Sequence, residues 1–177
     1  QGDRVAGFMP NMPETIIAML ATASIGAIWS SSSPDFGIKG VLDRFTQIEP
    51  KVLFAANGYY YNGKKFDSLE KLNSILDQLP SVNRVVVTPY TESNPDISSV
   101  KNGILWDNFK DSNPSPLKFE QLPFQHPLYI MYSSGTTGLP KSIVHGAGGT
   151  LIQHLKELRL HSNIYQDDTI FYFTTCG

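Results

Sequence analysis

The chain has 177 residues, of which 41% are hydrophobic and 17% are charged, and this is enough for one domain with a sizeable core. The formal net charge is −2 and the basic residues are scattered, with Lys64-Lys65 as the one adjacent pair, which argues against nucleic acid as a partner. The single cysteine, Cys176, rules out an internal disulfide framework and is typical of a reducing compartment, so we expect a cytosolic protein.

Short apolar runs bounded by turn residues predict four strands in the first half of the chain, over residues 5–9, 26–29, 52–56 and 85–87. The second strand is expected to give way to a loop over residues 30–36. Asn11, with Glu14 three residues later, predicts a capped helix start after the first strand. The apolar stripe of that helix is formed by Ile16, Ile17, Leu20 and Ala23.

Two further helices are predicted between the later strands. One covers residues 41–48 and ends before Pro50, because the residue before a proline is disfavoured in a helix. The other carries an apolar stripe over residues 69–79, and Asp67 and Glu70 form a capping pair at its start. Strands that alternate with helices in this way predict parallel pairing.

The second half of the chain begins with a long polar connection over residues 90–127, in which order is expected at residues 104–109. Strands are then predicted over residues 128–132, 143–144 and 170–173, with a helix marked by Leu151, Ile152, Leu155 and Leu158. The whole pattern predicts an α/β fold, with αβα layers around a mostly parallel sheet.

The uncharged segment at residues 15–34 is not expected to enter a membrane. Its apolar part ends at Trp29, which is too short to span a bilayer, and Glu14 stands where a signal peptide requires positive charge. Gln1 is not an initiator methionine, and the chain stops directly after a strand-like run. We therefore expect a piece of a longer protein.

Residues 132–142 read YSSGTTGLPKS, an unusual concentration of glycine, hydroxyl groups and lysine. Glycines allow backbone N–H groups to converge, hydroxyls add donors and lysine adds charge, so the run favours phosphate binding. It is not a Walker loop, because Pro140 stands where that motif requires its second glycine and has no N–H to donate. A dinucleotide-binding motif also fails, since Leu151 occupies the third glycine position.

The same run, from Tyr132 to Lys141, is similar to the phosphate-binding signature of the AMP-forming acyl-CoA synthetases, within the adenylate-forming superfamily. That signature reads [hydroxyl or Gly]-S-G-[ST]-T-G-x-P-K, and every position matches. The resemblance spans the chain: residues 2–11 resemble the family's GDRV…PN strand, and residues 18–27 its next helix and strand. Ser142 and Thr175, in place of the more usual glycine and aspartate, resemble the branch that activates acetoacetate.

This resemblance implies that residues 1–177 form part of an N-terminal AMP-binding domain, without the C-terminal lid domain. The implied reaction has two steps: a carboxylate attacks ATP to give an acyl-adenylate and pyrophosphate, and coenzyme A then displaces AMP. ATP, Mg²⁺ and coenzyme A are the implied substrates and cofactors, with acetoacetate as the acid. The parts that grip adenine and ribose, and the lysine that drives adenylation, would lie outside this chain, so the chain alone is expected to be inactive.

The resemblance also implies site residues. ATP phosphates would be held by Ser133, Ser134, Gly135, Thr136, Thr137, Gly138 and Lys141. Coenzyme A would contact Lys64 and the loop formed by Ser33, Pro34, Asp35 and Phe36. The substrate pocket would include His145, Thr175 and Gly177. Neither a catalytic residue nor a protein-held metal is expected within the chain.

Alternatives stay open for several residues. Lys64 could be a solvated turn lysine, His145 a structural histidine and Cys176 a structural thiol, while Arg44 is expected to form a surface ion pair. Two other functions compete with acetoacetate ligation. The first is a ligase for another short acid, acetate or propionate, and the second is a nucleotide-binding remnant without catalysis.

Overall fold

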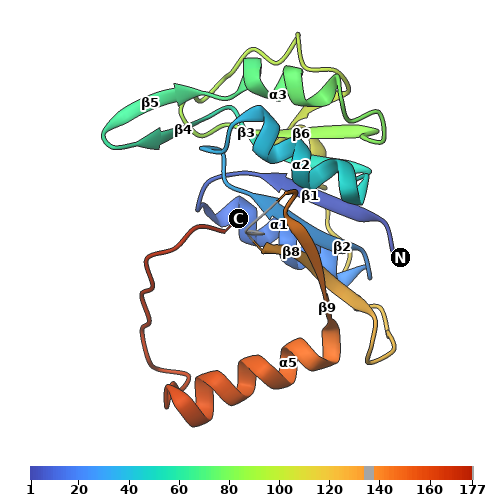
Figure 1. Cartoon of the computed structure of the whole chain (residues 1–177), viewed down its shortest axis with the longest axis vertical. Helices are drawn as coiled ribbons and strands as arrows, with labels where there is room; N and C mark the ends of the chain where they lie inside the picture. Colours follow the sequence, from blue (N-terminus) through green and yellow to red (C-terminus); the bar gives the residue numbers. More distant parts are fainter. Residues whose placement is uncertain (134–137, 177) are drawn as a thin grey trace.

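A seven-stranded sheet in the order β7-β6-β3-β1-β2-β8-β9 forms the centre of the fold (Figure 1). The computed structural model describes residues 1–133 and 138–176. The strands are β1 (Arg4–Phe8), β2 (Ile28–Ser32), β3 (Val52–Ala56), β6 (Arg84–Thr88), β7 (Gly103–Leu105), β8 (Pro127–Ser133) and β9 (Lys141–Gly146). Neighbours are parallel throughout except for β8 and β9, which are antiparallel. This confirms the predicted α/β fold with a mostly parallel sheet.

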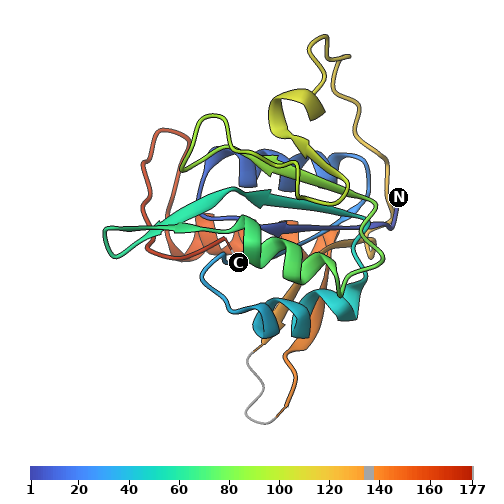
Figure 2. The same ribbon diagram turned by 90° about the horizontal axis from the view of Figure 1, so that it is seen from above.

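Helices cover both faces of the sheet, and Figure 2 shows the resulting layers. On one face α2 (Ile38–Ile48) and α3 (Leu69–Leu76) pack against alternate strand residues, including Phe8, Leu53 and Val85. On the other face α1 (Pro13–Ser24) and α4 (Trp106–Phe109) pack against the intervening residues, including Val5, Trp29 and Phe54. Two separate cores therefore hold the sheet in place, because successive side chains of a strand point to opposite faces.

Helix α1 forms where it was predicted, but its start and its buried face differ from the prediction. Met12 precedes its first turn without a side-chain cap, and Asn11 bonds elsewhere. Its buried residues are Thr15, Ala18 and Thr22. Of the predicted stripe, Ile16, Ile17 and Leu20 are 42–60% exposed, and Ala23 is half-buried. The short side chains of these buried residues allow α1 to lie close to the sheet. The larger apolar side chains face away from the sheet.

Strand β2 runs three residues further than predicted and includes Ser30 and Ser32, which are both buried. The Ser30 hydroxyl donates to the carbonyl of Ile130 on β8 at 2.9 Å, so a polar residue fits the sheet interior. A hairpin was also missed: β4 (Gly58–Tyr61) and β5 (Lys64–Asp67) pair in antiparallel fashion. Asn62 and Gly63 form its turn with φ of 48° and 72°, the conformation that Asn-Gly favours.

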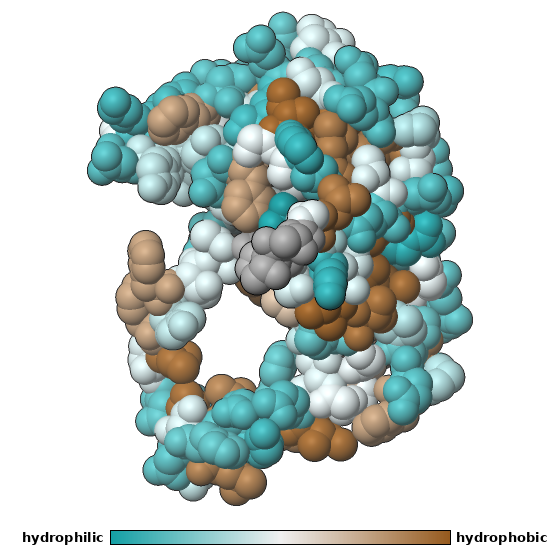
Figure 3. Space-filling model, viewed as in Figure 1, coloured by the Kyte–Doolittle hydropathy of each residue, from teal (hydrophilic) through white to brown (hydrophobic). Residues whose placement is uncertain are grey.

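The second half of the chain follows the prediction until its last segment. The long connection contains β7 and α4 where order was expected. After β9, α5 (Ala147–Lys156) continues into a π-helical turn (Glu157–His161) and stands away from the body of the molecule (Figure 3). The strand predicted over residues 170–173 is wrong. These side chains are 63–92% exposed, and no described strand lies beside them to pair with.

Candidate functional site

Three parallel strands end side by side at one edge of the sheet. β1, β2 and β8 are neighbours, so their last residues, Phe8, Ser32 and Ser133, lie at the same edge. The chain leaves β1 into α1 on one face and leaves β2 into α2 on the other, so the winding direction reverses between them. Open α/β sheets bind ligands beyond the carboxyl ends of their strands at such a reversal.

The hydroxyl-rich run lies at this edge, between β8 and β9. The two strands pair Ser133 with Lys141, so the ladder fixes both ends of the loop between them. Gly138 has φ of 99°, which glycine adopts without strain. Lys141 begins a strand and not a helix, in agreement with the rejection of a Walker loop. Four predicted phosphate-binding residues lie outside the described residues: Ser134, Gly135, Thr136 and Thr137.

Helix α2 contacts the β8–β9 hairpin from the side. The Gln47 amide nitrogen donates to the carbonyl of Pro140 at 2.9 Å, and the Gln47 amide oxygen accepts from the Ser142 hydroxyl at 2.9 Å. At the other end of the loop, the Tyr132 phenol donates to the backbone carbonyl of Arg44 at 3.3 Å. One turn of α2 therefore contacts both strands that carry the loop.

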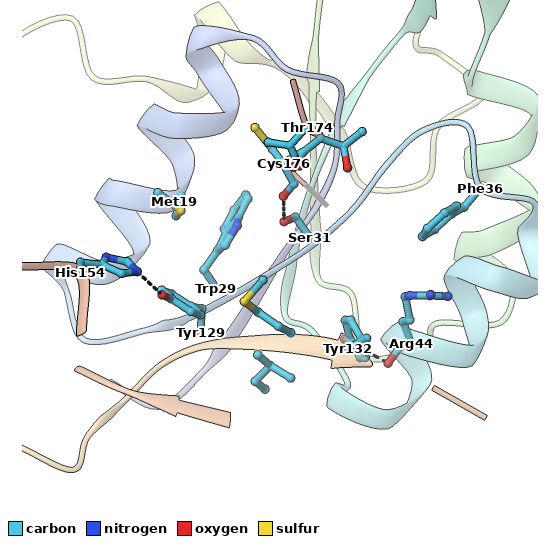
Figure 4. Close-up of a pocket in the computed structure, with 13 residues that line it drawn as sticks. Met19, Trp29, Ser31, Phe36, Arg44, Tyr129, Tyr132, His154, Thr174 and Cys176 are labelled. Carbon is cyan, nitrogen blue, oxygen red and sulfur yellow. Dashed lines mark hydrogen bonds between the residues drawn. The ribbon is translucent and has the colours of Figure 1, made fainter. Parts of the chain in front are cut away.

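A cavity of about 460 Å³ lies beside the hairpin, walled by side chains from α1, β2, α2 and β8 and by residues 174–176 (Figure 4). The Arg44 guanidinium lines it and lies 4.6 Å from the centre of the Phe36 ring and 5.6 Å from that of Tyr132. Arg44 also donates to the carbonyl of Gly40 at 2.7 Å. The ion pair predicted for Arg44 is wrong, since none involves it among the described residues; aromatic faces hold the cation instead.

The Tyr132 phenol is held in its neutral form in this cavity. Burial raises its pKa, while the hydrogen bond with Ser30 and the charge of Arg44 act in the opposite direction. A phenol is protonated at neutral pH, and the raised pKa of Tyr132 extends this to more alkaline pH, so its hydroxyl can donate a hydrogen bond to the Arg44 carbonyl of α2. The ring therefore ties β8 to α2 next to the loop.

The loop after β2, which contains the predicted coenzyme A contacts, is fixed by a lysine that the sequence did not single out. The Lys71 ammonium, on α3, donates to the carbonyls of Pro34 at 2.9 Å and Phe36 at 3.3 Å. It also lies 5.7 Å from the ring centre of Phe8 and 5.5 Å from that of Tyr59. Burial lowers the pKa of Lys71, and the nearby carboxylate of Asp35 opposes this shift. Ser33, another of the predicted contacts, is buried directly after β2.

Lys64 lies at the start of β5, directly after the Asn62-Gly63 turn, and its side chain is exposed. Its neighbour Lys65 is paired with Glu92 at 2.7 Å, whereas Lys64 forms no ion pair with any described residue. Lys64 is thus the lysine of this hairpin that is free to meet an anion. The hairpin projects from the body of the molecule near the carboxyl ends of the strands (Figure 1).

Residues 174–176 close one side of the cavity and are held by two side chains, Asn11 from the connection between β1 and α1 and Ser31 from β2. The Asn11 amide donates to the carbonyl of Thr174 at 2.5 Å and accepts from the N–H of Cys176 at 2.8 Å. Ser31 donates to the carbonyl of Cys176 (Figure 4). Thr175, which was predicted for the substrate pocket, lines this cavity. Burial raises the pKa of the Cys176 thiol, as suits a structural thiol. Gly177 lies outside the described residues.

His145 lies on β9 and does not line the cavity that Thr175 lines. Its ring faces Tyr129, with 5.2 Å between ring centres, and it borders a second hollow beside α5. His154 is the histidine of the first cavity, and its ring nitrogen lies 3.4 Å from the Tyr129 hydroxyl. The apolar periodicity of residues 151–158 predicted that His154 lies on a helix. It did not predict which residues His154 contacts.

Neither a cluster of metal ligands nor a membrane-spanning helix occurs in the described part of the chain. Across residues 1–133 and 138–176, no three His, Cys, Asp or Glu side chains converge as ligands of a metal ion. Within the same ranges, no helix combines the length and the apolar character needed to cross a bilayer.

Comparison with known proteins gives a consistent result. The sequence profile of the family described as AMP-binding enzyme matches residues 1–176. The acetoacetyl-CoA synthetase of Gallus gallus is 57% identical over 182 residues, covering 99% of this chain and 27% of the relative. The acetoacetyl-coenzyme A synthetase of Rhizobium meliloti (strain 1021) is 55% identical over 178 residues, with the same shares covered. The chain thus spans 27% of the length of these curated relatives.

The fold is similar to that of a solved relative. The structure of acetoacetyl-CoA synthetase from Streptomyces lividans matches with a TM-score of 0.92 at 43% sequence identity. The match covers 99% of this chain and 26% of that chain. The fold described above is therefore similar to that of the matched part of this relative.

Proposed function

Since the chain belongs to the AMP-binding enzyme family, we propose that the natural protein containing it is an ATP-dependent ligase that joins acetoacetate to coenzyme A. We assign residues 1–177 to part of its N-terminal AMP-binding domain. The observation that carries the proposal is the loop with the sequence SSGTTGLPK, held between β8 and β9 at the carboxyl edge of the sheet. The names of the relatives favour acetoacetate over acetate or propionate.

In the proposed first step, a carboxylate oxygen of the acid attacks the α-phosphorus of ATP. The bond to the bridging oxygen breaks, and pyrophosphate leaves with the electron pair of that bond. Such transfers depend mainly on positioning and charge neutralisation. We assign Ser133, Gly138 and Lys141, with the four loop residues between them, to the β- and γ-phosphates. Lys141 would oppose the negative charge that grows on the leaving pyrophosphate.

In the proposed second step, the sulfur of coenzyme A attacks the acyl carbon, AMP leaves, and the thiol proton passes to solvent. Lys64 suits a phosphate of the coenzyme, because it is exposed and has no ion pair among the described residues. The loop of residues 33–36 suits the path of the coenzyme, because Lys71 fixes its backbone. Thr175 is assigned to the acyl pocket; His145 and Gly177 complete the set proposed from the family resemblance.

Mg²⁺ is proposed to arrive with ATP as part of the substrate. Because no three acidic or histidine side chains converge in residues 1–133 and 138–176, we derive no step from a metal held by this part of the chain. The cytosolic location expected from the single cysteine stays a prediction.

The proposal is tested in the natural protein by measuring acid-dependent release of pyrophosphate from MgATP, with coenzyme A-dependent formation of AMP as the second readout. Acetoacetate, acetate and propionate are compared at matched concentrations, and acetoacetate is expected to give the highest kcat/KM. A preference for acetate or propionate would favour the short-acid alternative. ATP binding without acid-dependent pyrophosphate release would favour the non-catalytic alternative.

A further inference from the structure

Gln47 makes a bridge between α2 and the end of the phosphate loop. Every polar atom of its side chain is used: the amide nitrogen donates to Pro140 and also to the carbonyl of Asp43 at 2.6 Å, and the amide oxygen accepts from Ser142. The bond to Asp43, one helical turn earlier, holds the side chain in a single direction along α2. Gln47 is therefore already oriented when it meets the hairpin.

The two residues that Gln47 contacts stand immediately before and after Lys141. The carbonyl of Pro140 belongs to the peptide bond that leads into Lys141, and Ser142 is the next residue. On the opposite side, Lys141 is paired with Ser133 in the strand ladder. The backbone of Lys141 is thus held from two directions, by β8 across the ladder and by α2 through Gln47.

We propose that Gln47 is a positioning residue for Lys141, and that it acts through its hydrogen bonds to Pro140 and Ser142. The inference rests on the proposed function, because it takes Lys141 as the cation that meets the departing pyrophosphate. Charge neutralisation depends on where the ammonium is held, and small misplacements of an oriented group are costly in such reactions. Gln47 itself does not touch the substrate.

The position of α2 makes Gln47 suited to this task. Val41, Phe45 and Ile48 of α2 are between 0% and 5% exposed and lock the helix against the sheet. Gln47 is next to Ile48 in the chain, so its backbone cannot move without disturbing this core. A side chain on a rigid helix holds its partner in a more precise position than a side chain on a loop does.

The test uses variants in the natural protein. Gln47→Leu removes both hydrogen bonds to the hairpin. Gln47→Glu keeps an acceptor for Ser142 but faces the Pro140 carbonyl with an oxygen, and Ser142→Ala removes one bond alone. Thr46→Ala is the matched control, because the Thr46 hydroxyl bonds within α2 to Leu42 at 2.6 Å and does not reach the hairpin.

Gln47→Leu is expected to lower kcat/KM for MgATP by about two- to tenfold, the range expected for the loss of one or two neutral hydrogen bonds. KM for coenzyme A should stay unchanged, and Thr46→Ala should match the unmodified protein. In a double-mutant cycle, Ser142→Ala should have little further effect once Gln47 is leucine, because both changes remove the same bond.

Affinity for inorganic pyrophosphate, measured by calorimetry, gives a readout that does not require turnover. It should fall in Gln47→Leu and in Gln47→Glu while the melting temperature stays that of Thr46→Ala. If the unmodified protein binds pyrophosphate but shows no ligase activity, the proposed function fails. The pyrophosphate affinities of the Gln47 variants then still show whether Gln47 positions Lys141. Three results would overturn the inference. The effects of Gln47→Leu and Ser142→Ala could be additive in the cycle, or the Gln47 variants could bind pyrophosphate as tightly as Thr46→Ala does. The third is a loss of pyrophosphate affinity that is accompanied by a lower melting temperature.

Discussion

Replacing Lys71 by methionine should loosen the loop of residues 33–36. Methionine keeps most of the length of the side chain but removes the ammonium and its two donors. The Phe36 N–H donates to the carbonyl of Ser33 at 3.2 Å, so this loop contains an amide whose hydrogen exchange reports opening. The substitution therefore tests whether Lys71 holds the loop or merely lies beside it.

The expected magnitude follows from the contacts. A hydrogen bond from a charged donor contributes about 1.5–3 kcal/mol. The bond from Lys71 to the Pro34 carbonyl, at 2.9 Å, has the usual length of a hydrogen bond, whereas the bond to the Phe36 carbonyl, at 3.3 Å, is long. The ring contacts at 5.5 and 5.7 Å are near the outer limit of cation–π attraction. Desolvation of the ammonium, which lowers the pKa of Lys71, offsets part of the gain. A net loss of about 1–2 kcal/mol is expected, or about 5- to 30-fold faster exchange.

The assay is hydrogen–deuterium exchange of peptides that contain Phe36, followed by mass spectrometry. Lys39→Met is the matched control: Lys39 is an exposed lysine whose ion pair with Asp43 lies on the surface of α2, and it should change exchange by less than about twofold. If Lys71→Met exchanged no faster than Lys39→Met, Lys71 would not hold the loop. A raised KM for coenzyme A in Lys71→Met would separately support the path proposed for the coenzyme.

Four further outcomes are expected in the natural protein. Lys141→Ala should lower acid-dependent pyrophosphate release at saturating ATP by about a hundredfold or more, because it removes a cation from the leaving group; an unchanged rate would remove Lys141 from this role. Lys64→Ala should raise KM for coenzyme A and leave acid-dependent pyrophosphate–ATP exchange intact, and an equal fall in both would contradict the assignment. Cys176 should react with iodoacetamide with a pH midpoint above that of a free cysteine, because burial raises the pKa of the thiol and its thiolate forms later as pH rises. Asn11→Ala, which frees residues 174–176, should shift that midpoint downwards; the same profile in both proteins would show that Asn11 does not keep the thiol buried.

The elements with one clear physical signal were predictable from sequence. β3 covers residues 52–56 as predicted, because a run of apolar residues buried on both faces leaves no alternative arrangement. α2 likewise ends where Pro50 requires. The position of the loop between β8 and β9 was predictable for a different reason: its glycine, hydroxyl and lysine residues form one consecutive run after an apolar strand. The phosphate binding inferred from that run stays a prediction.

What the sequence did not predict depends on contacts between distant residues. Ser30 was assigned to a loop because serine is a poor strand former, but a carbonyl one hundred positions later satisfies its hydroxyl in the sheet. Asn11 was expected to cap α1, yet its amide bonds residues 174 and 176. Lys71 and Gln47 gave no signal, since a lysine or glutamine on an amphipathic helix is indistinguishable from one that faces water until its tertiary partners are known.

The apolar face of α2 decides where its polar side chains can act. Val41, Phe45 and Ile48 recur at spacings of four and three, so burying them against the sheet fixes the rotation of the helix about its axis. Once that rotation is set, Arg44 and Gln47, three residues apart, come to the side where β8 and β9 lie. A change in the core packing of α2 would therefore move both contacts together, and the loop at the sheet edge would respond to a substitution that never touches it.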